Sequence, residues 1–95
     1  MIKGVTEKEE KIIKDILKDY PYDFYYYGSR VKGDFTRASD LDILTDEIPY
    51  SALDEIKTRF NESLVPYIVN ISQKCNMSEH FYSLIKNDLV KIEKD

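Results

Sequence analysis

The most informative stretch of this chain runs from Gly28 to Asp42 and reads GSRVKGDFTRASDLD. It follows four aromatic residues, 24–27, whose type favours a β-strand. A Gly-Ser pair after a strand can open a helical turn, and the free N–H groups of such a turn attract an anion. Because glycine has no Cβ, the backbone there can approach a phosphate closely. The stretch therefore predicts a strand, a phosphate-binding turn and a second strand that begins with two acids.

The two acids, Asp40 and Asp42, stand at the start of that second expected strand, residues 41–45. Side chains alternate along a strand, so both carboxylates should point to the same face. Mg²⁺ prefers oxygen ligands, and a pair of such ions can stabilise the attacking and the leaving oxygens of a phosphoryl-type transfer. We therefore predict that Asp40 and Asp42 are the metal ligands of a two-ion Mg²⁺ site that holds a nucleoside triphosphate.

Five residues are predicted to hold the nucleotide: Gly28, Ser29, Arg30, Lys32 and Ser39. The Ser29 hydroxyl can donate to a phosphate oxygen. Arg30 and Lys32 bring positive charge to the triphosphate, and arginine can bind phosphate with two parallel hydrogen bonds. Ser39 precedes the first acid and either orients a carboxylate or contacts phosphate. The alternative interpretation is a glycine turn, a polar loop and an acidic strand start that bind nothing.

The segment before this stretch predicts one amphipathic helix. Thr6 and Glu9 form a capping box, and apolar residues recur at helical spacing through residues 12–17. Pro21 ends the helix, because a residue before proline avoids the helical region. The mixed lysines and acids of residues 1–20 are typical of the solvated face of a helix.

Residues 49–72 predict a second amphipathic helix and a third strand. Ser51 and Asp54 resemble a helix cap, and the apolar stripe that follows consists of Leu53, Ile56 and Phe60, with Leu64 one turn on. Residues 66–72 are rich in β-branched and aromatic residues, which favour a strand. Alternation along this strand places on one side Ile68, Asn70 and Ser72.

The remaining residues predict a short helix and a final strand. Ser78 should cap a helix that runs to about residue 87, with an inward face made of Phe81, Leu84 and Ile85. Residues 89–92 should form the last strand. Strands and helices thus alternate, which predicts a single α/β domain over residues 1–95, with helices packed on a small sheet.

Composition narrows the classes of function. Apolar residues make up 42% and charged residues 34%, which fits a soluble globular chain. The formal net charge of −4 argues against nucleic acid as a partner, because sequence-independent binding to it relies on basic patches. The apolar runs are too short to span a membrane and no signal peptide is evident, so we expect a cytoplasmic protein. A single cysteine, Cys75, excludes an internal disulfide.

The phrase GSRVKGDFTRASDLDIL resembles the signature of the nucleotidyltransferase superfamily that includes DNA polymerase β and kanamycin nucleotidyltransferase. It is most similar to the minimal nucleotidyltransferases, the MNT proteins of bacteria and archaea. The resemblance implies a mixed sheet flanked by helices, as in the polymerase β palm. It also implies that Gly28 and Ser29 hold the triphosphate of ATP or another NTP, while Asp40 and Asp42 bind Mg²⁺. The implied reaction transfers a nucleoside monophosphate, AMP being expected, to a hydroxyl.

One position departs from the family's pattern. The family's third carboxylate lies in a segment like Pro-Tyr-x-Val-Asp, and residues 66–70 here read Pro-Tyr-Ile-Val-Asn. The Asn70 carbonyl can ligate a hard cation, but it brings no charge and takes no proton from an attacking hydroxyl. We therefore assign Asn70 to the third catalytic position and expect reduced or absent activity. Three explanations stay open: a natural degenerate member, an inactivated variant, or a substitute acid such as Asp46 or Asp34.

The resemblance also implies a partner. MNT proteins are commonly paired with HEPN-domain proteins as toxin–antitoxin modules, and some add AMP to a tyrosine of the toxin. Two functions follow as alternatives: an antitoxin that modifies a HEPN toxin, and a non-catalytic module that binds nucleotide or covers its partner. An antibiotic-modifying enzyme is a third. For that third function the sequence offers no acceptor domain, although a homo-oligomer could build an acceptor cleft.

Overall fold

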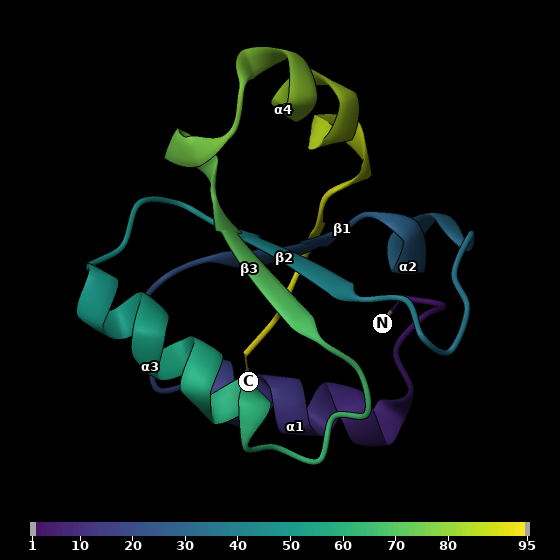
Figure 1. Cartoon of the computed structure of the whole chain (residues 1–95), viewed down its shortest axis with the longest axis vertical. Helices are drawn as coiled ribbons and strands as arrows, with labels where there is room; N and C mark the ends of the chain where they lie inside the picture. The colour runs from purple at the N-terminus through teal and green to yellow at the C-terminus, as the bar shows by residue number, and fades with distance from the viewer. Residues whose placement is uncertain (1, 95) are drawn as a thin grey trace.

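The structure is a computed structural model that describes residues 2–94. Its helices and strands, shown in Figure 1, follow in the order α1 (Glu7–Leu17), β1 (Phe24–Tyr27), α2 (Ser29–Lys32), β2 (Leu41–Thr45), α3 (Tyr50–Asn61), β3 (Val69–Gln73), α4 (Glu79–Ile85) and β4 (Val90–Lys91). Two 3₁₀ turns flank α4, η1 (Lys74–Asn76) before it and η2 (Lys86–Asp88) after it. No helix among the described residues is both long enough and apolar enough to cross a bilayer.

The four strands form one mixed sheet in the order β3-β2-β1-β4. β1 runs antiparallel to β2 and β4, whereas β2 and β3 are parallel. The register pairs Tyr27 with Asp42, and Asp42 with Asn70. Residues paired across neighbouring strands point to the same face, so these three side chains form one row on the sheet. The mixed sheet flanked by helices that we expected is confirmed.

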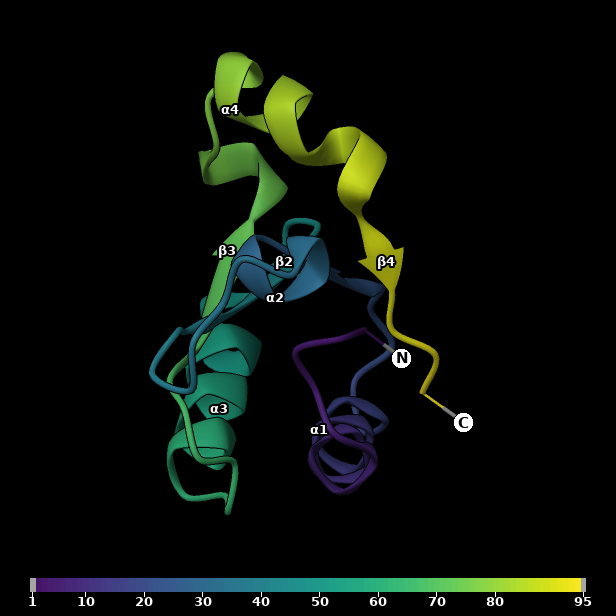
Figure 2. The same ribbon diagram turned by 90° about the vertical axis from the view of Figure 1, so that its right-hand side faces the viewer.

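The two faces of the sheet are covered unequally. α1 and α3 lie together against one face, and α4 lies over part of the other, as Figure 2 shows. The main core fills the first face with buried strand residues that include Phe24, Tyr26 and Ile43. A smaller cluster of Tyr27, Leu44 and Ile85 joins the second face to α4. The second face therefore remains partly open beside α4.

The helix starts follow local capping chemistry. Thr6 begins α1 with the expected capping box: its Oγ1 accepts from the Glu9 amide at 3.2 Å, and Glu9 Oε1 accepts from the Thr6 amide at 3.0 Å. The cap expected at Ser51 is wrong, because α3 begins at Tyr50 with Pro49 as its N-cap. Proline's ring fixes φ near the helical value, and Pro49 has φ −58°, which suits this earlier start.

The last helix is shorter than expected and only one of its inward residues is buried. Ser78 caps α4 by accepting from the Phe81 amide at 3.0 Å, and α4 then tightens into η2 after Ile85. Ile85 is buried, but Phe81 is 43% exposed and Leu84 is 58% exposed. The inward assignment of Leu84 is therefore wrong, and that of Phe81 holds only in part, because its ring meets that of Tyr27 edge-on. Helical spacing alone does not show how little of this helix the sheet covers.

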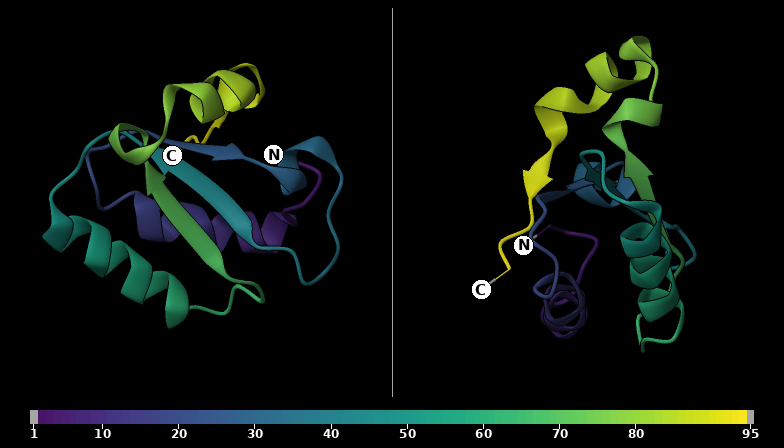
Figure 3. Two further views of the ribbon diagram at one scale, coloured as in Figure 1. Left: turned by 45° about the horizontal axis from the view of Figure 1, so that its top comes forward. Right: turned by 90° about the vertical axis from the view of Figure 1, so that its left-hand side faces the viewer.

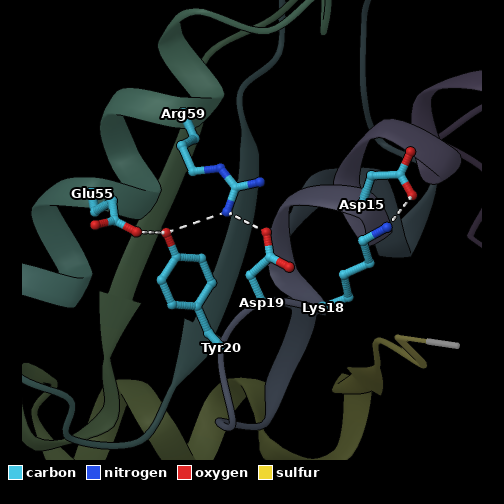
Figure 4. Close-up of polar contacts among 6 residues, drawn as sticks. All are labelled: Asp15, Lys18, Asp19, Tyr20, Glu55 and Arg59. Atoms are coloured by element: carbon cyan, nitrogen blue, oxygen red, sulfur yellow. Dashed lines mark hydrogen bonds and ion pairs between the residues drawn. The ribbon is translucent and has the colours of Figure 1, made fainter.

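A polar cluster links the end of α1 to α3 (Figure 4). The Tyr20 hydroxyl donates to Glu55 Oε1 at 2.5 Å, and Arg59 Nη1 donates to the Tyr20 oxygen at 3.4 Å. Arg59 also pairs with Asp19 at 3.0 Å. These contacts fix the two core helices against each other on the face of the sheet opposite the acids.

Candidate functional site

Three oxygen-bearing side chains meet on the open face of the sheet. Asn70 Nδ2 donates to Asp40 Oδ2 at 3.0 Å and to Asp42 Oδ1 at 3.5 Å. Asp42 and Asn70 are direct neighbours in the parallel β2–β3 register, and Asp40 immediately precedes β2. The structure thus brings Asn70 together with both acids.

The electrostatics of this cluster are unfavourable in the protein alone. Burial raises the pKa of Asp42, the hydrogen bond from Asn70 opposes that rise, and the charge of Asp40 adds to it. Two neighbouring carboxylates need a donor or a cation, because like charges partly removed from water repel each other. In the protein alone the amide of Asn70 supplies that donor to both.

The donor set fits one magnesium ion better than two. Asp40 and Asp42 carry the negative charge, and rotating the Asn70 amide would add a neutral oxygen, which suits a hard cation. Within residues 2–94 no cluster of three or more His, Cys, Asp or Glu side chains is arranged to hold a metal. Asp34 and Asp46 therefore do not complete a three-acid site, and Asp46 lies about 13 Å along the strand from Asp42.

Gly28 brings the backbone against the acids. It has φ +88°, and a Cβ added to it would lie 2.5 Å from Asp42 Oδ2. α2 starts immediately afterwards, where the Val31 and Lys32 amides both donate to the Gly28 carbonyl at 3.1 Å. Like the first residues of any helix, Ser29 and Arg30 have no intrahelical acceptor for their amides. A phosphate beside Asp42 would thus lie next to these amides and the partly exposed Ser29.

Arg30 does not point its side chain toward the acids, so the expected phosphate contact is corrected. Only 4% of Arg30 is exposed, and Nη1 donates to the Gly4 carbonyl at 2.6 Å. Nη2 and Nε donate to the Ser39 carbonyl at 2.8 and 3.2 Å, and Nη2 also approaches the carbonyls of Thr36 and Arg37 at 3.4 and 3.3 Å. Arg30 therefore holds the loop that leads into Asp40. The reason is that the loop carbonyls need donors, which the guanidinium fork supplies.

The other side of Arg30 stacks on the segment that leads into β3. Its guanidinium carbon lies 3.9 Å from the centre of the Tyr67 ring and 5.3 Å from that of Phe35. The Tyr67 hydroxyl in turn donates to Glu9 Oε1 at 3.0 Å, in the capping box of α1. Arg30 thus contacts the chain just before Asp40 and three residues before Asn70.

Lys32 and Ser39 occupy the edge of the site. Lys32 Nζ lies 4.0 Å from Asp88 Oδ2 in η2, and about half of each side chain is exposed, so this pair is weak. Ser39 Oγ accepts from the Thr36 amide at 2.9 Å, so its hydroxyl shapes the loop. The structure shows no contact between Ser39 Oγ and either acid among the described residues.

Two aromatic residues, Tyr27 beside Asp42 and Phe81 next to Tyr27, were not assigned to the site from the sequence. Tyr27 lies opposite Asp42 in the β1–β2 register, and its hydroxyl donates to Ser72 Oγ at 3.3 Å. Phe81 meets the Tyr27 ring edge-on, with ring centres 6.3 Å apart. Strand alternation could have placed Tyr27 on this face, but only once the β1–β2 register was known.

Tyr27 and Ser72 also line a groove of about 610 Å³, here called the β3 groove. One side of it is formed by α3 with Tyr50 and Lys57, and the other by residues 76–81. A larger hollow, about 1210 Å³, runs along the lysine-rich outer surface of α1. Neither Asp40 nor Asp42 lines that hollow, and no residue of α2 does, so the hollow is separate from the site.

Comparisons with known proteins show the family to which the chain belongs. The family model described as "Nucleotidyltransferase domain" matches residues 9–94, a range that includes every residue of the site. A Haemophilus influenzae protein named "Probable protein adenylyltransferase MntA" is 34% identical over 95 residues. That alignment covers 95% of this chain and 83% of the relative.

Proposed function

Because this chain belongs to the nucleotidyltransferase domain family, we propose that it binds ATP or another NTP with Mg²⁺ at Asp40 and Asp42. The observation that carries this proposal is the contact of Gly28 with Asp42 beneath the start of α2. It puts backbone amides and carboxylates side by side, which is what a magnesium-bound triphosphate requires.

Each group has a separate task in this proposal. The backbone at Gly28 and Ser29 approaches the triphosphate, and the Ser29 hydroxyl donates to it. Asp40 and Asp42 would hold Mg²⁺, which when bound neutralises phosphate charge and favours in-line attack. Arg30 keeps the loop before Asp40 closed and does not touch the nucleotide.

The proposed reaction moves AMP to a hydroxyl. The acceptor oxygen bonds to the α-phosphorus, the bond from that phosphorus to the bridging oxygen breaks, and pyrophosphate leaves. The acceptor proton passes to water, because Asn70 is an amide and takes none. A positioned base is worth roughly 10²- to 10⁴-fold in rate, so we expect this chain to be slow by that factor.

The acceptor is proposed to be another protein. The printed name of the 34% identical relative is that of a protein adenylyltransferase, which supports a protein hydroxyl as acceptor and AMP as the transferred group. We further propose a cytoplasmic HEPN-domain toxin as the partner and an antitoxin role for this chain. This step depends on the resemblance to MNT proteins.

A second function, the non-catalytic module, is favoured by one specific observation. The Asn70 amide donates to both acids and already supplies part of the stabilisation that a cation would bring. In such a protein the site would be vestigial and the chain would act by covering its partner.

Three variants separate the two functions. Isothermal titration with Mg²⁺ and a non-hydrolysable ATP analogue should show binding for the natural chain and a loss of at least tenfold for Asp42→Asn. Asp46→Asn removes an exposed acid beyond β2 and should leave binding unchanged.

Asn70→Asp should then switch on label transfer from α-labelled ATP to a HEPN partner, by roughly 10²-fold or more. If neither the natural chain nor Asn70→Asp binds the analogue, the nucleotide proposal is wrong. If both bind it but neither transfers label, the non-catalytic module is supported.

A further inference from the structure

The outer edge of β3 lies free beside the site. β3 pairs with β2 on one side only and is terminal in the sheet, as Figures 1 and 3 show. The Leu41 amide donates to the Ile68 carbonyl at 2.8 Å, which sets the phase of the parallel ladder. In a parallel strand the backbone N–H and C=O groups of every second residue bond to the same neighbouring strand, and those of the residues between point the other way. The backbone groups that point outward are therefore those of Val69, Ile71 and Gln73.

This edge lacks the proline and the charges that usually prevent strand pairing, although Ile71 and Gln73 are themselves only 7% and 5% exposed. Exposed edges are normally blunted by proline, by charged side chains or by a bulge. β3 reads VNISQ, with no proline and no charge, and Ile68 just before it is 63% exposed. Such an edge is a template for an added strand, the mode in which many proteins bind extended peptides.

The β3 groove runs along this edge and has a charge preference. Ile71, Ser72 and Gln73 of β3 line it, with Lys57 of α3 alongside. Lys57 is its one charged lining residue within the described chain, and no acid lines it, although the sequence has 18 acidic against 14 basic residues. An extended segment with an acidic residue in the β3 groove would complement Lys57.

An added strand would bring a side chain to the acids. Neighbouring strands lie about 4.8 Å apart, and residues paired across them point to the same face. A residue opposite Asn70 would therefore share the face of Asp40 and Asp42 at two strand spacings, about 9.6 Å, from the Asp42 backbone, a gap that a long side chain such as tyrosine can reach across. Aromatic rings line the approach, with Tyr27 and Phe81 in contact and Tyr50 76% exposed.

We propose that the outer edge of β3 binds an extended segment of the acceptor protein as an added strand. The segment places a hydroxyl-bearing residue opposite Asn70 and an acidic residue beside Lys57. This inference depends on the proposed transferase function for its meaning, but the binding it describes requires no nucleotide.

The test uses the whole chain labelled with ¹⁵N, without nucleotide or metal. The probe is a short synthetic peptide of alternating valine and threonine that carries one tyrosine and, toward one end, one glutamate. Millimolar peptide should shift and protect the outward amides of Val69, Ile71 and Gln73, and leave those of α1 unchanged. A matched peptide with proline at its centre cannot complete the ladder and should have no effect.

A charge variant tests the orientation. Lys57→Glu should lower the affinity for the glutamate peptide about three- to tenfold and raise the affinity for a peptide with lysine in place of glutamate. Lys11→Glu is the control, because it makes the same change on α1, outside the β3 groove, and should alter neither affinity.

Three results would overturn the inference. The first is that millimolar peptide shifts none of the outward amides. The second is that the proline peptide shifts them as much as the alternating peptide does. The third is that the chain forms a dimer in which the same amides are protected with no peptide added, which would mean that a second copy of the chain occupies the edge. Each result leaves the Mg²⁺–ATP titration unaffected, so failure here and failure of the proposed function can be told apart.

Discussion

Asn70 places a neutral amide between two carboxylates, where it relieves their repulsion without adding a third charge. A functional group of this kind stabilises the protein in its metal-free state. An aspartate at the same position would increase the repulsion and make the cluster depend more strongly on a bound cation. At the scale of a residue, Asn70 therefore stabilises the carboxylate pair and, on the proposed function, would weaken its hold on a cation.

Gly28 gives the sharpest test of the contact between the turn and the acids. Gly28→Ala should lower the free energy of unfolding by about 1–3 kcal/mol and abolish Mg²⁺–ATP binding, because φ is +88° and the new Cβ would meet the Asp42 carboxylate. Gly33→Ala is the control. Its φ is +95°, but its nearest neighbour is Lys3 Cδ at 3.9 Å, so it should cost about 1 kcal/mol and retain binding. Urea melts and titration measure both, and equal loss of binding in the two variants would contradict the assignment.

The raised pKa of Asp42 predicts how the free energy of unfolding depends on pH. Its pKa is raised in the fold from an ordinary value of 3.8, so on increasing pH the unfolded chain loses this proton first. The stabilising contribution of Asp42 is therefore present below that value and is lost as pH rises through the raised pKa. Asp42→Asn should be more stable than the natural chain at pH 7 and about equal at pH 3. Urea melts in a chelator measure this, and a less stable variant at pH 7 would contradict it.

At the scale of elements, the loop between α2 and β2 depends on Arg30. The guanidinium donates to the carbonyls of Thr36, Arg37 and Ser39 in that loop and to that of Gly4, while its face lies on Tyr67. One side chain therefore joins the N-terminal segment, α2, the loop and the approach to β3. The acids keep their relative positions because these segments are held together.

Arg30→Lys should show this directly. Lysine keeps the charge but lacks the planar fork, so the buried carbonyl of Gly4 and the partly buried carbonyls of the loop lose donors, and stability should fall by about 2–4 kcal/mol. Amides of residues 34–40 should exchange faster, while those of α3 should keep their protection relative to global unfolding. Arg37→Lys alters an exposed arginine of the same loop and should change neither quantity. Uniform loss of protection across the chain would argue for a purely global role.

At the scale of the whole molecule, the site lies on the sheet face that the helices leave half open. α1 and α3 make the main core on one face, so ligands bound on the other face add stability without rearranging that core. Mg²⁺ with the ATP analogue, at about 100 times its Kd, should stabilise the chain by about 2.7 kcal/mol, and a chelator should remove most of this effect. A thermal melt measures it. An unchanged melting temperature at saturating ligand would mean that the folded chain does not bind it.

The sequence predicted those features that depend on local chemistry and on strand alternation. The Thr6 capping box, the Gly28 turn and the shared face of Asp40 and Asp42 follow from rules that act over a few residues. The direction of Arg30 does not, because it is set by carbonyls of a loop that closes only in the fold. Phe81 and Leu84 are less buried than the sequence pattern predicts, for a related reason. Periodicity identifies an apolar stripe, whereas the area that covers it is a property of the tertiary structure.

The pairing of Asp42 with Asn70 limits how this protein can change in length. A one-residue insertion between Tyr67 and Asn70 would move every later side chain of β3 to the opposite face, so Asn70 would turn into the core and Ile71 toward the acids. The turn after α3, around residues 62–64, can absorb the same insertion at the surface. Relatives of this chain should therefore vary in length after α3 and keep a fixed count of residues from Tyr67 to Asn70.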